Sequence, residues 1–128
     1  MGSVKRLAWA KANGCPWNTA TTHFIARHGL LEALQWAREL DCPWDERTCA
    51  LAAYGGHLDV LRWARENGCP WNEDTCWSAA AGGHLGVLQW AREHGCPWGW
   101  YTLLFASVSQ QPEVLQWAQE HGCPSVPT

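Results

Sequence analysis

The sequence predicts an all-α protein built as a solenoid of short helical repeats, and three observations support this fold class. Tryptophan recurs at a step of 27 residues, at Trp9, Trp36, Trp63, Trp90 and Trp117. Residues 56–71 and 83–98 carry nearly the same phrase, GHLDVLRWARENGCPW and GHLGVLQWAREHGCPW. Apolar residues within each repeat follow helical spacing, without strand-like alternation. A fixed period of this size is typical of arrays in which each unit buries its apolar face against its neighbours.

Composition limits the classes of partner. The chain has 128 residues, of which 47% are hydrophobic and 16% charged, so we expect an ordered globular array. Its net charge is -3, and lysine and arginine form no cluster of the kind that follows a phosphate backbone or an anionic membrane. No apolar run approaches the roughly 20 residues that span a bilayer. We therefore expect neither a nucleic acid nor a membrane partner.

The period divides residues 1–128 into a single repeat array. We expect an N-terminal half-unit at 4–17 and full units at 18–44, 45–71, 72–98 and 99–124, which together give about nine helices. Val4 aligns with Leu31, so the array opens on a second helix and its first unit lacks a first helix. Because solenoids need polar terminal caps, we expect either an excised fragment or self-association through the uncapped N-terminal end.

The first helix of a unit is clearest at residues 72–81, NEDTCWSAAA. Asn72 is a good N-cap, and two acidic residues follow it in the first turn. Cys76, Ala79 and Ala80 continue at helical spacing until two glycines end the helix.

The second helix of the same unit is expected at residues 84–94, HLGVLQWAREH. Its apolar stripe consists of Val87, Leu88, Trp90 and Ala91, and the residues expected to face away are Gln89, Arg92 and Glu93. Gly95 is expected to end the helix in the left-handed conformation, and Pro97 prevents its continuation. Each full unit is therefore an antiparallel helix pair.

Residues 74–95, DTCWSAAAGGHLGVLQWAREHG, resemble the helix-turn-helix of an ankyrin repeat. The usual ankyrin phrase runs Thr-Pro-Leu-His-Leu-Ala-Ala-x-x-Gly-His-x-x-Val-Val and closes at a glycine. The matching positions in the two central units are Ala79, Ala80, Gly83, His84, Val87, Leu88 and Gly95, and Ala52, Ala53, Gly56, His57, Val60, Leu61 and Gly68. The match weakens outward, where HGLLEAL at 28–34 and QQPEVL at 110–115 replace the Gly-His phrase.

The units depart from the ankyrin pattern in length, because ankyrin repeats run to about 33 residues. The missing residues lie after the closing glycine, where ankyrins build a projecting β-hairpin finger. Between Gly68 and Asp74 only the segment CPWNE intervenes, which is too short for such a hairpin. The chain resembles the short, Trp-rich ankyrin-like arrays of large DNA viruses, protists and algae, and this resemblance implies a solenoid without fingers.

The repeated tryptophans and cysteines are expected to be packing residues. In the ankyrin resemblance, Cys96 and Trp98 occupy positions that point inward, so the Cys-Pro-Trp turn seals the core where the hairpin is missing. Trp71 and Cys76 also flank the Asn72 cap at the spacing of a hydrophobic staple. The second-helix tryptophans are expected to form a buried ladder between adjacent units.

The seven cysteines do not indicate a metal or another cofactor. Equivalent positions in stacked helices lie about 8–10 Å apart, beyond the roughly 7 Å limit for a disulfide and too far apart to share one zinc ion. No Cys-x-x-Cys motif occurs. An odd cysteine count without a signal peptide favours reduced thiols, and hence a cytoplasmic or nuclear protein.

The sequence also predicts no enzyme. By the ankyrin resemblance, His57 and His84 hydrogen-bond the loop between the two helices of a unit. No serine or cysteine nucleophile stands beside a base, no isolated acidic pair lies in an apolar setting, and no glycine-rich phosphate loop follows a strand.

Of the functions considered, binding to a partner is the one that these observations leave, and we expect a non-catalytic protein–protein interaction module. Exposed columns vary between repeats, and in the first helices these variable columns contain aromatic and charged residues. The predicted binding face consists of Arg47, Tyr54, Asp74, Trp77, Ala81, Tyr101, Leu104 and Val108. The ankyrin resemblance places this face on the concave side. The alternative is an array that holds a small molecule, a carbohydrate or a metal through exposed tryptophans and the Cys-Pro-Trp turns.

Overall fold

The structure is a computed structural model that describes residues 17–125, and over this range it is helical and contains no strand. Its eight helices are α2 (Thr19–Arg27), α3 (Leu31–Glu39), α4 (Glu46–Tyr54), α5 (Leu58–Glu66), α6 (Glu73–Gly82), α7 (Leu85–Glu93), α8 (Trp100–Val108) and α9 (Pro112–Glu120). The all-α class expected from the sequence is confirmed for these residues. The half-unit expected at 4–17 lies outside them, apart from Trp17.

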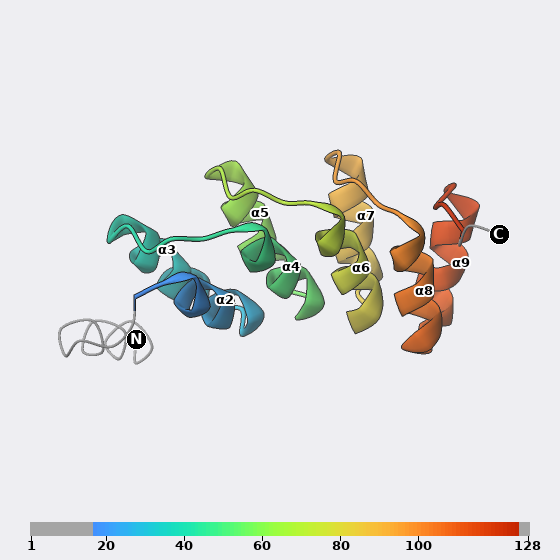
Figure 1. Ribbon diagram of the computed structural model, residues 1–128, viewed down its shortest axis with the longest axis horizontal. Coiled ribbons are helices and arrows are strands. Elements are labelled where there is room, and N and C mark those ends of the chain that lie inside the picture. Colours follow the sequence, from blue (N-terminus) through green and yellow to red (C-terminus); the bar gives the residue numbers. More distant parts are fainter. Residues whose placement is uncertain (1–16, 126–128) are drawn as a thin grey trace.

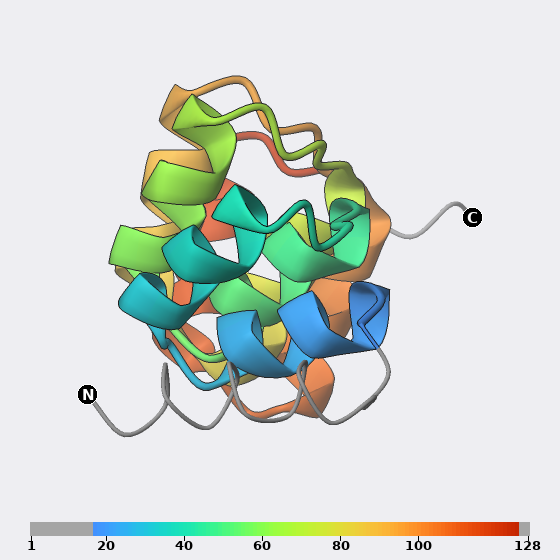
Figure 2. The same ribbon diagram turned by 90° about the vertical axis from the view of Figure 1, so that its left-hand side faces the viewer.

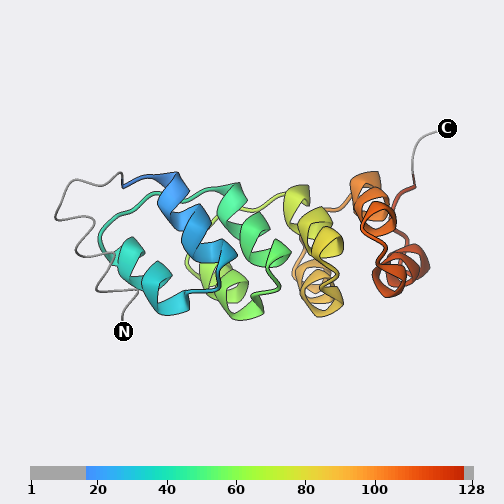
Figure 3. The same cartoon turned by 90° about the horizontal axis from the view of Figure 1, so that it is seen from below.

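The helices form four pairs that stand side by side along the long axis of the molecule (Figure 1). Seen from below, α2, α4, α6 and α8 form one row, and α3, α5, α7 and α9 form a second row (Figure 3). A view from the α2 end shows each pair turned relative to the pair before it (Figure 2). We call the two layers the first-helix side and the second-helix side.

The two layers differ in how closely their helices pack. On the first-helix side, α2 packs against α4, α4 against α6, and α6 against α8. On the second-helix side, α3 and α5 touch at a few points only, and the later second helices touch one another even less. The first helices therefore lie on the inner, tighter side of the row, and the space between second helices must be filled by side chains.

Polar caps explain where the first helices begin. The side chains of Asn18, Asp45 and Asn72 each accept a hydrogen bond from the backbone N–H two residues later. These bonds satisfy one of the free N–H groups at a helix start. The cap expected at Asn72 is confirmed, whereas the last first helix begins at Gly99, which has no side chain to cap it.

Left-handed residues end the second helices. Gly95 has a φ of 83°, as expected, and follows the last turn of α7. In the outer units the chain keeps this geometry without glycine. Asp41, after the second helix α3, takes the place that Gly68 has in the next unit, with a φ of 61°. The same holds at the end of a first helix, where Gln110 after α8 takes the place that Gly83 has after α6, with a φ of 57°. The repeated backbone path therefore persists where the sequence motif has weakened, at some cost in strain.

The core lies between the two layers and is made of small and branched side chains. Its fully buried residues include Leu34, Leu61, Leu88, Ala37, Ala64, Ala91 and Ala118. The expectation that the second-helix tryptophans are buried is wrong in degree, because Trp63, Trp90 and Trp117 are only half-buried and pack against the edge of the core. The reason is the wide spacing of the second helices, which leaves one side of each ring open.

Candidate functional site

The predicted binding face lies on the first-helix side, but its residues differ in exposure. Tyr54, Tyr101, Leu104 and Val108 are exposed, at 43%, 41%, 36% and 69%. Arg47 is also exposed, whereas Asp74, Trp77 and Ala81 are half-buried. The face thus consists of an exposed apolar edge at α4 and α8 and a partly covered centre on α6.

Trp77 is held by two contacts that the sequence did not reveal. Its indole Nε1–H donates to Asp74 Oδ1 at 2.8 Å. Its ring stacks on Phe105, with centroids 4.6 Å apart and an interplanar angle of 25°. Phe105 in turn lies 6.5 Å from the ring of Tyr101, which stacks on Trp100 at 3.9 Å. These four aromatic residues form a continuous patch, which we call the α6–α8 aromatic patch.

Phe105 was not among the predicted residues, although the repeat offered a signal for it. Its column contains Phe24, Leu51, Ser78 and Phe105, and therefore also varies between units. Phe24 at the other end of the row is 60% exposed. The variation in this column therefore marks Phe105 as a further candidate for the binding face.

The structure brings three predicted residues together in a groove between α4 and α6. Arg47, Asp74 and Trp77 line a hollow of about 260 Å³, together with Ala50, Leu51 and Ser78. Tyr54 does not join this group; instead the Arg27 guanidinium lies 5.8 Å from its ring centroid. The candidate face is therefore two neighbouring features, the α4–α6 groove and the α6–α8 aromatic patch.

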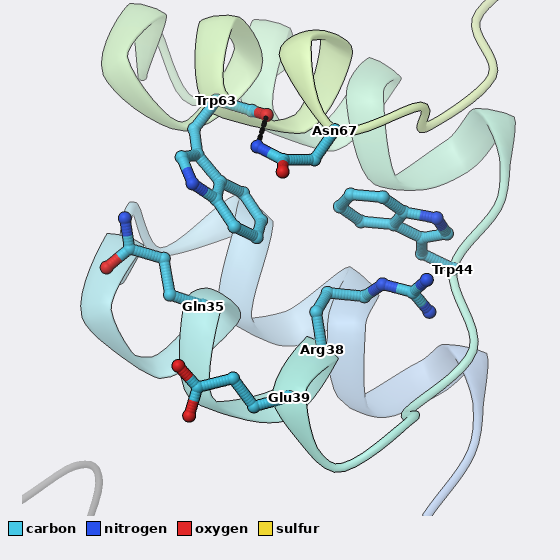
Figure 4. A pocket seen from close by; sticks show the side chains of 6 residues that line it. All are labelled: Gln35, Arg38, Glu39, Trp44, Trp63 and Asn67. Carbon is cyan, nitrogen blue, oxygen red and sulfur yellow. Dashed lines mark hydrogen bonds between the residues drawn. The ribbon is translucent and has the colours of Figure 1, made fainter.

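A second kind of hollow repeats along the second-helix side. The first lies between α3 and α5, measures about 480 Å³, and is lined by Gln35, Arg38, Glu39, Trp44, Trp63 and Asn67 (Figure 4). The second, of about 300 Å³, is lined by Arg62, Arg65, Glu66, Trp71, Trp90 and His94. The third, of about 440 Å³, is lined by Gln89, Arg92, Glu93, Trp98, Trp117 and His121. The same repeat positions build all three, and we call them the second-helix grooves.

Each second-helix groove contains two tryptophans from different columns of the repeat. Trp44, from the Cys-Pro-Trp turn, meets Trp63 of the next helix pair edge-on, with centroids 5.8 Å apart. Trp71 meets Trp90 and Trp98 meets Trp117 in the same way, at 5.9 and 5.8 Å. The turn tryptophans therefore fill the space left between diverging second helices.

An arginine fixes the turn tryptophan in each groove. The Arg65 guanidinium lies 4.3 Å from the Trp71 ring centroid and donates a hydrogen bond to the Cys69 carbonyl at 2.6 Å. Arg38 and Arg92 make the equivalent contacts. Arg92 was expected to face away from the core; its guanidinium lies 4.4 Å from the ring centroid of Trp98, which packs against the core, and the Arg92 side chain is half-buried. Such stacking combines a cation–π contact with shielding of the ring from water.

The cysteines have structural hydrogen bonds. Their thiols at the ends of the four units donate to the carbonyl of the residue that caps the first helix of the same unit. The pairs are Cys42 with Asn18, Cys69 with Asp45, Cys96 with Asn72 and Cys123 with Gly99, at 3.4 to 3.5 Å. Each bond closes its helix pair at the end opposite the interhelical turn.

The surroundings of three thiols favour their protonated form. A hydrogen bond with Cys49 and burial raise the pKa of Cys69, and a hydrogen bond with Cys96 and burial raise the pKa of Cys76. Burial also raises the pKa of Cys123. Within residues 17–125, no three side chains of the His, Cys, Asp and Glu types converge as a metal site would require.

The two loop histidines pack across neighbouring units. His57 Nε2 lies 3.0 Å from the Arg27 carbonyl, so the side chain links its own loop to the preceding helix pair. Its ring covers Gly29, and the His84 ring covers Gly56 in the same manner. A side chain on either glycine would collide with the imidazole. His57 was expected to hydrogen-bond the loop within its own unit; in the structure its hydrogen bond joins two neighbouring units.

A scan against known protein families finds no match to the chain, and a search of curated proteins finds no relative. Among the helices described, none is long and apolar enough to cross a membrane.

Proposed function

We propose that the chain is an ankyrin-like array of 27-residue units without β-hairpin fingers, and that it binds a protein partner through its first-helix side without catalysing a reaction. Repeated interactions support the repeat assignment. The cysteine hydrogen bonds and the arginine–tryptophan stacks recur at matching positions in successive helix pairs. Such recurrence is what a solenoid built from one unit requires.

The observation that carries the binding proposal is the α6–α8 aromatic patch. Trp77, Phe105 and Tyr101 stack in sequence, and Leu104 and Val108 extend the apolar surface at 36% and 69% exposure. None of these residue types is required by the repeat, because other units have different residues at the same positions. Exposed apolar patches on a well-packed domain mark interaction sites, and tryptophan and tyrosine dominate the energy of interfaces.

The neighbouring groove suggests the chemistry of the partner. Arg47 and Asp74 provide one positive and one negative charge beside Trp77. An apolar side chain of the partner fits against the aromatic patch, while flanking polar groups of both signs fit the groove. A protein segment offers this combination, and the charged residues would set its orientation more than its affinity.

Site-specific crosslinking tests this proposal. A photoreactive amino acid at Leu104 should crosslink one protein partner, whereas the same probe at Gln116, exposed on the second-helix side, should not. The partner is then purified, and its affinity is compared for the wild-type chain and Trp77→Ala. We expect a loss of about 2 kcal/mol or more for an interface anchor. Equal crosslinking at both positions, or unchanged affinity, would contradict the proposal.

One further expectation extends the proposal. Buried free thiols suit a reducing compartment, so we propose an intracellular protein, cytoplasmic or nuclear.

A further inference from the structure

The three second-helix grooves share a chemistry that differs from that of the first-helix side. All three have the same plan, and their volumes of about 480, 300 and 440 Å³ suit small ligands or the units of a linear polymer. The smallest is the one in which Arg62 stands where the other two have glutamine. Packing accounts for the tryptophan pairs and their arginines, but it does not account for the exposed glutamate that recurs in the lining of all three grooves, as Glu39, Glu66 and Glu93.

Each groove combines indole rings with mixed polar groups. In Figure 4 the Trp63 ring borders the hollow together with Gln35 and Glu39, whereas the Arg38 side chain lies against the Trp44 ring. Within the described residues, neither indole N–H of this pair has a hydrogen-bond partner, and both remain available as donors.

The polar groups combine donors with acceptors at nearly balanced charge. Arg38 and the two indoles can donate, Glu39 can accept, and the amide of Gln35 can do both. Glu39 is exposed and forms no ion pair within the described residues, so its carboxylate is available. The neighbouring grooves keep this pair as Arg65 with Glu66 and Arg92 with Glu93. Hydroxyl groups, which donate and accept at once, match this lining.

Other classes of ligand match the lining of the second-helix grooves less well. A cation would compete with the Arg38 guanidinium, which already lies 4.3 Å from the Trp44 ring centroid. An anion would meet the glutamate that recurs in every groove. A proline-rich peptide presents carbonyl acceptors but few donors, and would leave that carboxylate without a partner.

We propose that the second-helix grooves bind a neutral oligosaccharide of linked pyranose rings, with one apolar sugar face against the second-helix tryptophan of the groove, such as Trp63, and hydroxyls shared between the glutamate and the arginine. Sugars whose hydroxyls are equatorial have such flat apolar faces, and β-1,4-linked glucose and N-acetylglucosamine are the common neutral examples. A chain of linked rings repeats along its length, as the grooves do, and several weak contacts on one chain add to its avidity.

The groove between α3 and α5 should be the strongest of the three. Asn67 occupies its rim, whereas the other two have His94 and His121, which stack on Trp90 and Trp117 at 4.1 and 4.3 Å and cover part of those rings. This groove is also the largest, at about 480 Å³. A single sugar ring should therefore bind there first.

Calorimetric titration of the full chain with cellohexaose, and separately with chitohexaose, tests the proposal and shows which of the two sugars binds. We expect at least one hexaose to bind, and to bind about tenfold or more tightly than its disaccharide because several grooves act together. A decaproline peptide and a heparin hexasaccharide serve as controls for the peptide and anion classes. Binding of either control without binding of a neutral hexaose would overturn the proposal, as would no binding of either hexaose at millimolar concentration.

Matched variants locate the binding. The triple variant Glu39→Ala, Glu66→Ala, Glu93→Ala removes three exposed groove carboxylates and should weaken hexaose binding about tenfold or more. The control triple variant Glu32→Ala, Glu46→Ala, Glu113→Ala removes the same charge from exposed positions outside the grooves and should bind normally. Circular dichroism verifies that both fold. Equal affinity of the two variants would exclude the grooves as the site, and Trp77→Ala, on the other side, should leave hexaose binding unchanged.

Discussion

The first-helix and second-helix sides of the molecule use the same 27-residue period in opposite ways. On the first-helix side the helices pack closely, and the outward positions differ from unit to unit, as Arg47, Asp74 and Tyr101 illustrate. On the second-helix side the helices diverge, and the outward positions keep the same chemistry at every junction.

This difference separates two requirements on a repeat protein. Close packing of small residues such as Ala52 and Ala79 holds the first helices together, so their outer surface is free to vary and can become specific for one partner. The wider second-helix junctions need large side chains to exclude water, and the pairs of tryptophans with their arginines fill that need. The packing of the second-helix side is constant because every junction between neighbouring pairs must be filled by the same large side chains. The first-helix surface can vary because the packing of the first helices does not depend on their outward residues.

The largest expected effect lies where the two sides meet. Leu61→Ala removes a fully buried side chain from the core between the layers and should lower the free energy of unfolding by about 3–5 kcal/mol. Its exposed neighbour provides the control, because Arg62→Ala should change stability by less than about 0.5 kcal/mol. Urea denaturation monitored by tryptophan fluorescence measures both. A similar loss for both variants would mean that the core does not lie between the two layers.

The next effect compares one tryptophan from each side. Trp63→Ala should destabilise by about 2–3 kcal/mol, less than for a fully buried tryptophan, because one side of its ring is open. Trp77→Ala should cost about 1–2 kcal/mol, from its stacking on Phe105 and its bond to Asp74. Thermal melts followed by circular dichroism rank the two. If Trp77→Ala is the more damaging, the α6–α8 aromatic patch is part of the core and not a free surface.

A smaller effect tests why arginine recurs on the second-helix side. Arg65→Ala loses the stack on Trp71 and the bond to the Cys69 carbonyl, and should cost about 1 kcal/mol. Arg65→Lys should recover only part of this, because an ammonium group cannot lie flat on an indole while it donates sideways. Arg62→Lys is the matched control and should be neutral. Full recovery by lysine would show that charge alone explains the position.

The smallest effect concerns the thiols and depends on pH. Because the folded-state pKa values of Cys69 and Cys76 are raised, their contribution to stability is complete below the unfolded thiol pKa of about 8.5 and is lost as pH rises above it. We expect a loss under about 1 kcal/mol per thiol at pH 9. Denaturation at pH 7 and pH 9 measures it, and Cys69→Ala should reduce the pH dependence.

A chelator distinguishes this thiol role from metal binding. Since the described cysteines act as buried hydrogen-bond donors, a zinc chelator should leave the melting temperature unchanged at pH 7. A decrease of several degrees would favour the metal-binding alternative instead.

Much of the local structure could be predicted from the sequence. The cap at Asn72, the helix end at Gly95 and the helical class depend on interactions within a few residues, and capping residues and glycines in the sequence mark them directly. The candidate site was predicted less completely. Phe105 was missed because its role depends on Trp77 of the preceding helix pair. The sequence of neither helix alone determines how two rings orient across the interface between them.

The sequence by itself determined the period, the helices and the side of each helix that faces the core, because these follow from the spacing of apolar and turn-forming residues. Only the tertiary structure decided how far apart neighbouring pairs stand on each side. That spacing is a balance of packing among many side chains across units, and it left Trp63 half-buried, turned Arg92 onto Trp98 and opened the grooves. The spacing of apolar residues along one helix does not determine that balance. The second-helix grooves could therefore be identified only in the tertiary structure.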